Sequence, residues 1–523
     1  MLTNRRPPHA PDAREADPDL IVRLESPLPD SLPAGVATAI FCSGTCFHRR
    51  ETVDGFALLL DGKRVEPAAS GMPRVDLAHA YRPAGLEARS YRSGFWATVP
   101  IRAIDRADGI ELAAAVRLAS GRELVASLGR IDVVAREPAP RYESLAGRPT
   151  AGLIAICMAT YEPDLPLFET QVESLRGQSH LQWICLLSDD CSSGSRFADI
   201  QRIVAGDERF VVSRSPTRLG FYRNFERALR MVPAEAELVA LCDQDDFWHP
   251  DKLEVLRKAL GSAQLVYSDQ RLVDADGRVL SDTLWRGRRN NHTSLASMLV
   301  ANTVTGAASL FRREVAELTL PFPDTPGLQF HDHWLGAVAL AAGDVAYVDR
   351  PLYDYVQHPG AVFGKVGTKP SSGAPRRRMG PPWRGTFNRW RSAYFLGYLA
   401  REVQAQTLSV RCPELLTARK RRDLDRYIAS ARSPLAFLWL ATRTLRSVIG
   451  RNETLGSEAE LARGVLWRVL IERRIRRAAL PGRKGLDASF PTPMSFEQMG
   501  FEQKRLRRWR ARMLEGGDTG TDW

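Results

Sequence analysis

Residues 238–248 read LVALCDQDDFW. The first half is a short apolar run, typical of a strand buried on both faces. The second half places three carboxylates directly after it, on Asp243, Asp245 and Asp246. Burying clustered carboxylates is costly unless a cation or hydrogen-bond donors compensate their charge. Such dense oxygen ligands favour Mg²⁺ or Mn²⁺, which usually hold substrate phosphates as further ligands. The stretch therefore predicts a strand that ends in a metal-binding turn.

The segments before this strand alternate between apolar strands and helices. We expect strands at 153–158, 183–187 and 210–213, and helices at 165–178, 197–204 and 221–231. This alternation predicts a parallel sheet with crossover helices, in which ligands bind at the carboxyl ends of the strands. Two more polar clusters follow strands, at 159–163 and 188–193. Each alone could be a helix cap, but three clusters at one edge indicate a ligand site.

The rest of the chain divides into a β-rich part and a helical part. Asp61-Gly62 and Ser120-Gly121 are hairpin turns between short apolar runs, a pattern that predicts an immunoglobulin-like β-sandwich. The fold class is therefore multidomain, with a β-sandwich, a central α/β domain and a basic helical region. The expected boundaries are a disordered N-terminus at 1–20, the sandwich at 21–145, the α/β domain at 150–365, a linker at 366–384 and the helical region at 385–523.

Composition excludes several classes of protein. The 523 residues are 44% hydrophobic, so neither a wholly disordered nor a fibrous protein fits. No apolar run approaches the roughly 20 residues that a membrane span needs. The seven cysteines are an odd number over a long chain, and they indicate a reducing compartment. The first 19 residues contain no apolar run, so we expect no secretory signal and a cytoplasmic location.

The net charge of +12 is unevenly distributed. Residues 371–523 hold 31 Lys and Arg against 14 Asp and Glu, a net +17, so the first 370 residues carry −5. The segment Phe501–Leu514 places Leu506, Trp509 and Met513 on one helical side among Lys and Arg, which suits an anionic bilayer. No nucleic-acid-binding motif accompanies the charge. We therefore predict an anionic membrane surface as a partner of the C-terminal basic helices, and no nucleic acid. A plain solvated helical face is the alternative.

The α/β domain resembles the family 2 glycosyltransferases, which are nucleotide-sugar-dependent enzymes with the Rossmann-like GT-A fold. The resemblance spans residues 152–364 and rests on ATYEP (159–163), SDDCSS (188–193), RLGFYRNFERAL (218–229), CDQDDFW (242–248), HPDKLE (249–254), NTVTG (302–306), HDHW (331–334) and YVQHPG (355–360). A single Asp-x-Asp motif is common, but this ordered set is specific. Residues 243–253 are especially similar to a subgroup that includes rhamnosyltransferases of bacterial surface polysaccharides.

The resemblance implies a set of residues that bind the nucleotide sugar: Thr160, Glu162, Asp189, Asp190, Arg218, Asn224 and Asp243. Thr160 and Glu162 would line the nucleotide pocket, and Asp190 or its neighbour Asp189 would bond the base or ribose. The two aspartates could instead be a helix N-cap pair. Arg218 and Asn224 would contact the diphosphate or ribose, and Asn224 could equally be an ordinary helix residue.

The resemblance also implies the metal ligands and the catalytic base. Asp243 and Asp245 form the Asp-x-Asp motif, with Asp245 preferred as the direct ligand of Mg²⁺ or Mn²⁺. His358 would join the metal or the diphosphate, although a single late histidine is as often structural. Asp332 would be the base that removes the proton of the acceptor hydroxyl. One displacement inverts the anomeric configuration, so an inverting enzyme is expected.

Two positions depart from the usual family pattern. Cys191 stands where glycine is frequent, which puts the geometry of that turn in question. His331 stands where an acid is frequent, which alters the surroundings of the neighbouring Asp332.

The sequence thus predicts a metal-dependent enzyme that transfers a sugar from a nucleotide-sugar donor to a glycan or lipid-linked acceptor. We expect it to work in the cytoplasm, peripherally at the inner face of the plasma membrane. The alternative is a catalytically inactive carbohydrate-binding or scaffold protein with a degenerate transferase domain. A nucleotidyltransferase is a third reading, but that class normally has a Gly-rich loop after its first strand, where this chain has residues 159–163.

Overall fold

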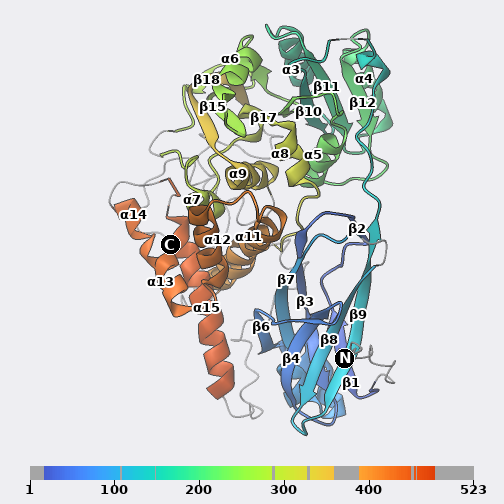
Figure 1. Cartoon of the computed structure of the whole chain (residues 1–523), viewed down its shortest axis with the longest axis vertical. Helices are drawn as coiled ribbons and strands as arrows, with labels where there is room; N and C mark the ends of the chain where they lie inside the picture. Colours follow the sequence, from blue (N-terminus) through green and yellow to red (C-terminus); the bar gives the residue numbers. More distant parts are fainter. Residues whose placement is uncertain are drawn as a thin grey trace, which may run out of the picture.

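The computed structural model describes residues 17–105, 109–147, 149–285, 289–326, 330–358, 388–448, 453–454 and 456–477. Two small sheets lie below a larger sheet that is covered by helices, and a group of C-terminal helices touches both parts (Figure 1). The linker at 366–384 and the basic segment Phe501–Leu514 lie outside the described residues. Of the N-terminal 20 residues only 17–20 are described, and Leu20 begins a strand instead of belonging to a disordered tail.

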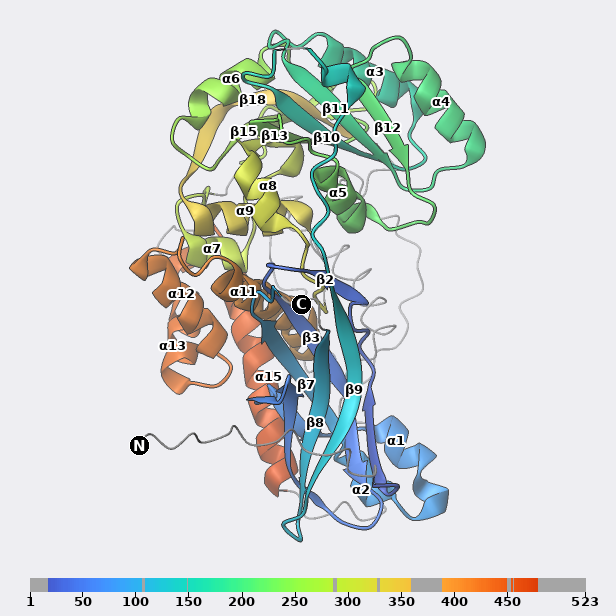
Figure 2. The same ribbon diagram turned by 45° about the vertical axis from the view of Figure 1, so that its right-hand side comes forward.

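The N-terminal part consists of two sheets that enclose a common core (Figure 2). One sheet has the order β1 (Leu20–Leu24), β3 (Thr38–His48), β7 (Gly94–Ile101) and β6 (Ala69–Met72). The other has the order β2 (Ser31–Pro33), β9 (Glu123–Val134), β8 (Ile110–Leu118), β4 (Val53–Leu60) and β5 (Lys63–Val65). Short helices α1 (Val75–Ala80) and α2 (Glu87–Tyr91) lie between β6 and β7.

The two predicted hairpin turns are confirmed. Asp61 and Gly62 take φ of 47° and 74°, the left-handed conformations that a tight two-residue hairpin needs, and they join β4 to β5. Gly121, with φ of 88°, turns the chain between β8 and β9.

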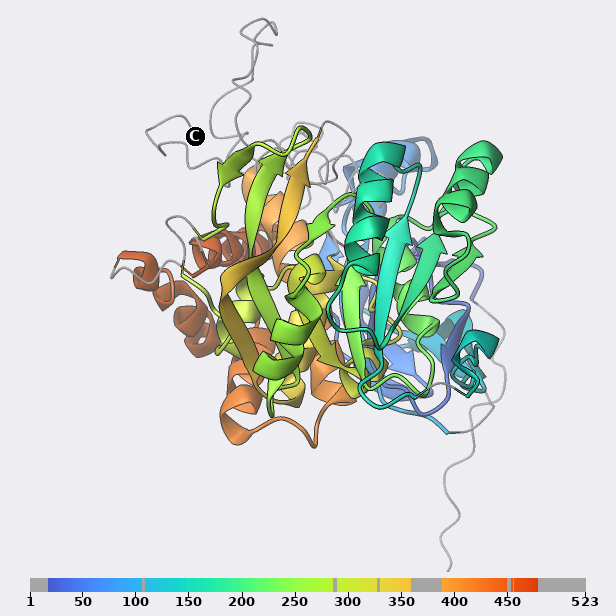
Figure 3. The same cartoon turned by 90° about the horizontal axis from the view of Figure 1, so that it is seen from above.

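The central sheet has the order β12 (Phe210–Arg214), β11 (Trp183–Asp189), β10 (Ile154–Thr160), β13 (Leu238–Cys242), β17 (Ser309–Arg312), β15 (Leu265–Asp274), β18 (Val345–Gln357) and β14 (Phe247–Trp248), with β16 (Val279–Ser281) beside β15. Figure 3 looks down on this sheet from above, with the N-terminal sheets beneath it. The first four strands are parallel, as predicted. β17 runs antiparallel to both neighbours, so the sheet as a whole is mixed.

The reversal at β17 follows from where the chain enters it. Residues 302–308 precede the strand, and Leu310 then pairs with Ala240, so the chain comes in near the carboxyl end of β13 and runs back along it. The loop 302–306 is thereby held at the same edge as the acidic turn after β13.

Helices of the central domain connect and cover these strands. They are α3 (Leu165–Arg176), α4 (Gly194–Val204), α5 (Phe221–Arg230), α6 (Lys252–Leu260), α7 (Leu295–Val300), α8 (Arg313–Thr319) and α9 (His331–Ala342). The expected helices before β13 are all present, with ends displaced by a few residues. Such displacements are common, because capping and fraying decide the ends of helices.

The C-terminal helices pack against both the small sheets and the central domain. They are the π-helix η4 (Ala393–Leu399), α11 (Ala400–Arg411), α12 (Ala418–Ala429), α13 (Pro434–Thr442), α14 (Leu445–Val448) and α15 (Ser457–Arg477). On η4, the buried Tyr394 hydroxyl accepts a hydrogen bond from the Trp96 indole of β7 at 3.1 Å. Among the helices in the described part of the chain, none is both long enough and apolar enough to cross a membrane.

Several arginines of the C-terminal helices are buried and bind backbone carbonyls. Arg411 donates through Nε to the Ala37 carbonyl at 2.7 Å, and through Nη1 to carbonyls of the central domain at 2.9–3.2 Å, on Leu318, Thr319 and Pro321. Burial lowers the pKa of Arg411 to about 10, so it stays charged at neutral pH. Arg468 similarly donates to the Ala68 carbonyl at 3.0 Å. Part of the C-terminal positive charge therefore joins the domains and does not face solvent.

We expect Arg411→Ala to weaken the packing between the three parts by about 2–4 kcal/mol, because four buried carbonyl oxygens lose their donor. The measurement is the thermal unfolding midpoint together with the rate of limited proteolysis. The exposed Arg419→Ala on α12 is the matched control and should change stability by less than about 0.5 kcal/mol. Equal effects of the two substitutions would contradict the structural role of Arg411.

Candidate active site

The three polar clusters of the sequence meet at one edge of the central sheet. Thr160 at the end of β10 is in register with Asp189 at the end of β11. On the other side of β10, Met158 pairs with Cys242, which directly precedes Asp243. The in-register pairing of parallel strands therefore brings the three loops together, as expected for a ligand site in a sheet of this kind.

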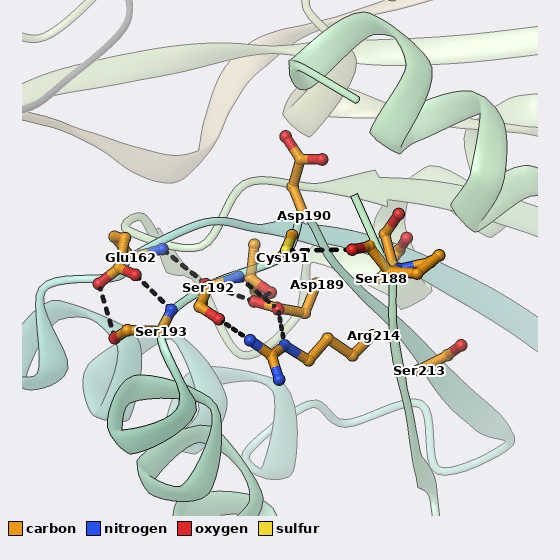
Figure 4. A network of polar contacts seen from close by, with 12 residues as sticks. Glu162, Ser188, Asp189, Asp190, Cys191, Ser192, Ser193, Ser213 and Arg214 are labelled. Atoms are coloured by element: carbon orange, nitrogen blue, oxygen red, sulfur yellow. Dashed lines mark hydrogen bonds and ion pairs between the residues drawn. The ribbon is translucent and has the colours of Figure 1, made fainter. Parts of the chain in front are cut away.

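Asp189 is buried, and its carboxylate organises the second cluster. Its Oδ2 accepts the Ser192 N–H at 2.9 Å, and its Oδ1 accepts the hydroxyls of Ser192 at 2.6 Å and Thr160 at 3.2 Å. Arg214 lies 3.7 Å from Oδ2 (Figure 4). All of these contacts with the Asp189 carboxylate are made by groups of the protein itself. Asp189 and Thr160 thus fix the turn, and neither of them caps α4, whose N-cap is Ser193.

Asp190 points away from this network and holds the loop that leads into α5 (Figure 4). Its two oxygens accept the backbone N–H groups of Leu219 and Gly220. On the same loop, the Arg218 guanidinium stacks 3.7 Å above the Tyr161 ring, and its Nη1 donates to the Tyr161 hydroxyl at 2.8 Å. Asp190 and Arg218 therefore join the first and second clusters to the N-terminus of α5, where N–H groups favour anions.

Asn224 lies one turn into α5 and is buried. Its Nδ2 donates to the Ser188 carbonyl at 2.8 Å and the Thr160 carbonyl at 3.3 Å, and its Oδ1 accepts the Ser188 hydroxyl at 2.7 Å. Both amide hydrogens are used to tie α5 to β10 and β11. The structure thus shows Asn224 holding α5 against β10 and β11, and the contact with the diphosphate or ribose that the resemblance implied stays a prediction.

Glu162 and Cys191 both adopt positive φ, at 41° and 62°. The Glu162 carboxylate accepts the Ser193 N–H at the start of α4, and its own N–H donates to the Ser192 hydroxyl at 2.8 Å. Cys191 has a left-handed backbone, the conformation that glycine adopts without steric cost. The family's frequent glycine is therefore explained, and the turn keeps its shape with cysteine at the expense of strain.

The acidic turn after β13 is fastened to the first cluster by Gln244. Its side chain accepts the Tyr161 N–H at 2.8 Å and donates to the Tyr161 carbonyl at 3.3 Å. Asp245 Oδ2 lies 2.8 Å from His358 Nε2, and this contact raises the pKa of His358. Aspartate and histidine are thus paired across 113 residues of sequence.

The electrostatics of this turn fit a divalent cation. Burial, followed by the charges of Asp245 and Asp332, raises the pKa of Asp243 to about 7. Asp246 accepts the Val356 N–H through Oδ1, while its buried Oδ2 has no hydrogen-bond partner among the described residues. Clustered carboxylates with an unsatisfied buried oxygen are suited to Mg²⁺ or Mn²⁺.

A second cluster of carboxylate and histidine side chains, in the N-terminal part of the chain, does not fit a metal ion. In the part of the chain that the structure describes, only Asp17, Asp19 and His48 bring three ligand atoms within 4.8 Å of one another. His48 Nδ1 accepts the N–H groups of Arg50 and Glu51, at 3.2 and 2.9 Å, so Nε2 carries the proton of the neutral ring and is not a ligand. Among the described residues, the carboxylates after β13 do not bring three ligand atoms within this distance, so a cation there would need further ligands such as substrate phosphates.

Lys252 is a residue of the site that sequence reasoning missed. It is fully buried, and its ammonium lies 3.3 Å from the centre of the Trp248 ring and 4.6 Å from that of Tyr353. It donates to the Ala307 carbonyl and attracts the charges of Asp246 and Asp243. Burial lowers its pKa well below the usual value. A lysine at the start of a helix looks like a surface residue in sequence, so no local signal predicts this role.

Asp332 lies in the first turn of α9, and its charge reaches Asp243. The preceding His331 is buried and stacks 3.8 Å from the Phe225 ring, and burial lowers its pKa to about 3, so it is neutral. A methyl group at Gly306 would come within 2.7 Å of His331 Nε2. The loop 302–306 thus packs against the Asp332 segment, and the histidine adds no charge beside the aspartate.

We expect Cys191→Gly to raise the free energy of unfolding by about 0.5–1 kcal/mol, because release of the left-handed strain exceeds the entropy gained by the unfolded chain. Cys191→Ala is the control. It keeps the strain and removes only the thiol contact with the Pro216 carbonyl at 3.6 Å, so it should be close to neutral. Urea denaturation curves measure both. A Gly variant less stable than the Ala variant would be the opposite of what this geometry predicts.

Part of this chain is similar in sequence to a curated protein. The uncharacterized protein y4gI of Sinorhizobium fredii (strain NBRC 101917 / NGR234) is 24% identical over 231 residues, which are 43% of this chain and 25% of that protein. The chain thus spans about a quarter of the length of this curated relative.

Two solved structures overlap weakly with the chain. TarS 1–349 of S. aureus in complex with UDP-GlcNAc gives a TM-score of 0.38 at 13% identity, over 62% of this chain and 92% of that one. The mannosyltransferase PcManGT of Pyrobaculum calidifontis, in complex with GDP-Man and Mn²⁺, gives a TM-score of 0.33 at 17% identity, over 64% and 89%. Neither overlap is close enough to support a functional conclusion.

The sequence of the central domain also matches a protein-family model. Residues 155–319 match the model described as glycosyl transferase family 2. The matched range begins in β10 and ends with α8, so it contains the three polar clusters and the loop 302–306. The resemblance drawn from the motifs is thereby confirmed, and residues 155–319 form a glycosyltransferase domain of family 2.

Proposed function

We propose that the protein is an inverting, metal-dependent glycosyltransferase that moves a sugar from a nucleotide-sugar donor to a glycan or lipid-linked acceptor. The proposal rests on two interactions at the carboxyl edge of the sheet. Asp245 Oδ2 lies 2.8 Å from His358 Nε2, and the negative charge of Asp332 acts on Asp243. These groups come from three distant segments of the chain. A degenerate scaffold has no need to keep all of them together.

The donor would lie across the loops of the first and second clusters. Asp189 and Thr160 fix the turn after β11, and Asp190 holds the loop with Arg218, whose guanidinium borders the edge beside Tyr161. Asp245 and His358, together with Asp243, would hold Mg²⁺ or Mn²⁺. Such a cation, when bound, neutralises the charge that develops on the leaving diphosphate.

Asp332 would remove the proton of the acceptor hydroxyl as that oxygen attacks the anomeric carbon. The hydroxyl would approach from the side of the loop 302–306, which packs against His331. The neutral His331 places no charge next to the base, and its ring is held by stacking on Phe225. Because attack and departure occur on opposite faces of the sugar, a single displacement inverts the anomeric configuration.

The acceptor class rests on the similarity of residues 243–253 to enzymes of bacterial surface polysaccharides. A lipid-linked glycan at the inner face of the plasma membrane is an acceptor that a peripheral cytoplasmic enzyme reaches. The basic C-terminal part of the chain supports an anionic membrane as the partner that retains the enzyme there.

We expect Asp332→Asn and Asp245→Asn each to lower kcat by about 10²–10⁴-fold, because one removes the base and the other a metal ligand. Nucleoside diphosphate release and product mass, measured over a panel of nucleotide sugars and glycan acceptors, give the rates. Asp276→Asn, in an exposed turn after β15, is the control and should retain full activity. If Asp332→Asn transferred sugar at the rate of the unaltered chain, the assignment of the base would be wrong.

We further expect nucleoside diphosphates to bind only when Mn²⁺ or Mg²⁺ is present, and chelation to abolish binding. Isothermal titration with and without Mn²⁺ measures this. Asp245→Asn should lose the metal-dependent binding, whereas Asp332→Asn should keep it, because the base does not hold the diphosphate. Absence of metal-dependent binding in the unaltered chain, for every nucleoside diphosphate tested, would favour the inactive scaffold.

A further inference from the structure

We propose that an apolar face on α13 and α14 docks on the surface of an anionic lipid bilayer. This face, called the α13–α14 face below, consists of Leu435, Leu438, Thr442 and Leu445. The inference deepens the membrane partner that belongs to the proposed function, and it assigns the contact to helices of the described chain instead of the segment 501–514.

The α13–α14 face is unusually exposed for its composition. Leu435, Leu438 and Leu445 are 81, 57 and 60% exposed. Leu435, Leu438 and Thr442 follow one another at spacings of three and four residues, which places them on one side of α13, and Leu445 begins α14 after two intervening residues. The other side of α13 is buried through Ala436 and Leu440.

The composition of α13 makes the exposure of its leucines unusual. The helix reads PLAFLWLAT and contains no charged residue. A helix that is apolar all round is normally buried in a core or in a membrane. α13 packs against α12 and α15 and lies at the outer side of the helical region, away from β9 (Figure 1). Its leucines form a convex helical surface, which suits insertion between lipid headgroups.

Exposed positive charge lies on α12, which packs against α13, and just before α13 itself. Exposed arginines lie on α12, at Arg419, Arg421, Arg422 and Arg426, and Arg432 is exposed just before α13. Leucines that enter the acyl boundary, with arginines at the level of anionic headgroups, are the usual means by which a helix binds a membrane surface.

α15 carries a second stripe of the same kind. Between Ser457 and Arg473 its exposed residues are Arg463, Leu466, Leu470 and Arg473, at spacings of three, four and three. Arginine thus lies at both ends of an exposed pair of leucines. Because α15 packs against α13, the apolar and basic character extends over two neighbouring helices.

An anionic bilayer fits these observations better than an acidic protein. Exposed leucines on α13 and exposed arginines on the neighbouring α12 match acyl chains beneath anionic headgroups. The half-exposed Trp439 lies within the same helix, and tryptophan is enriched at the interface of membranes.

The test uses the full chain and vesicles of phosphatidylcholine, either alone or mixed with an equal part of phosphatidylglycerol. The unaltered chain should float with the anionic vesicles and only weakly with the neutral ones. The double substitution Leu435→Gln, Leu438→Gln should weaken binding to the anionic vesicles by about tenfold or more, since apolar insertion and charge contribute together. Both side chains are exposed, so the fold should be unaffected.

Leu181→Gln is the matched control, because Leu181 is 68% exposed but lies between α3 and β11 of the central domain. It should bind the anionic vesicles like the unaltered chain. Light scattering would show whether a second copy occupies the face. A dimer that becomes monomeric in the double variant, without vesicle binding by either, would overturn the proposal, as would a monomer that binds no vesicles or a double variant that binds normally.

The same variants separate this inference from the proposed function. Nucleoside diphosphate release with a water-soluble acceptor should be equal in the unaltered chain, the double variant and Leu181→Gln. Loss of vesicle binding with normal release supports the docking face. No release from any chain, together with loss of vesicle binding in the double variant alone, would contradict the proposed function and leave the docking face supported.

Discussion

The edge of the central sheet must hold several carboxylates close together in spite of their mutual repulsion, and much of the structure serves this requirement. Asp243 shows the cost directly, since burial and the charges of Asp245 and Asp332 raise its pKa to about 7. The chain opposes the repulsion with His358, which contacts Asp245, and with the buried Lys252. A divalent cation with its diphosphate would complete the compensation.

The same groups link the acidic turn to the surrounding loops. Lys252 donates to the Ala307 carbonyl while it lies over the Trp248 ring, so a single cation holds both the turn and the entry to β17. Gln244 bonds the backbone of Tyr161, which fastens the first cluster to the third. These contacts join the first polar cluster, the acidic turn and the entry to β17 into one unit.

The arginines of the C-terminal helices fall into two groups, one that binds backbone carbonyls inside the protein and one that is exposed. Arg411 and Arg468 lie in the interior, where they bind carbonyls of the small sheets and, in the case of Arg411, also of the central domain. Arg422 and Arg426 of α12 are exposed. Counting charges along the sequence treats both kinds alike, because burial depends on neighbours that are distant in the chain. The net charge therefore overstates how basic the surface is.

The sequence by itself determined the alternation of strands and helices before β13, the hairpin at Asp61-Gly62 and the three polar clusters at the strand ends. These features depend on periodicity and on turn-forming residues, which are local properties. Tertiary structure alone decided the reversed β17, the hydrogen bond of Asn224 to β11 and the burial of Lys252. The contact of Arg411 with Ala37 joins positions 374 residues apart. No local pattern encodes such a contact, because its energy comes from burial and from donors that only the complete fold brings together.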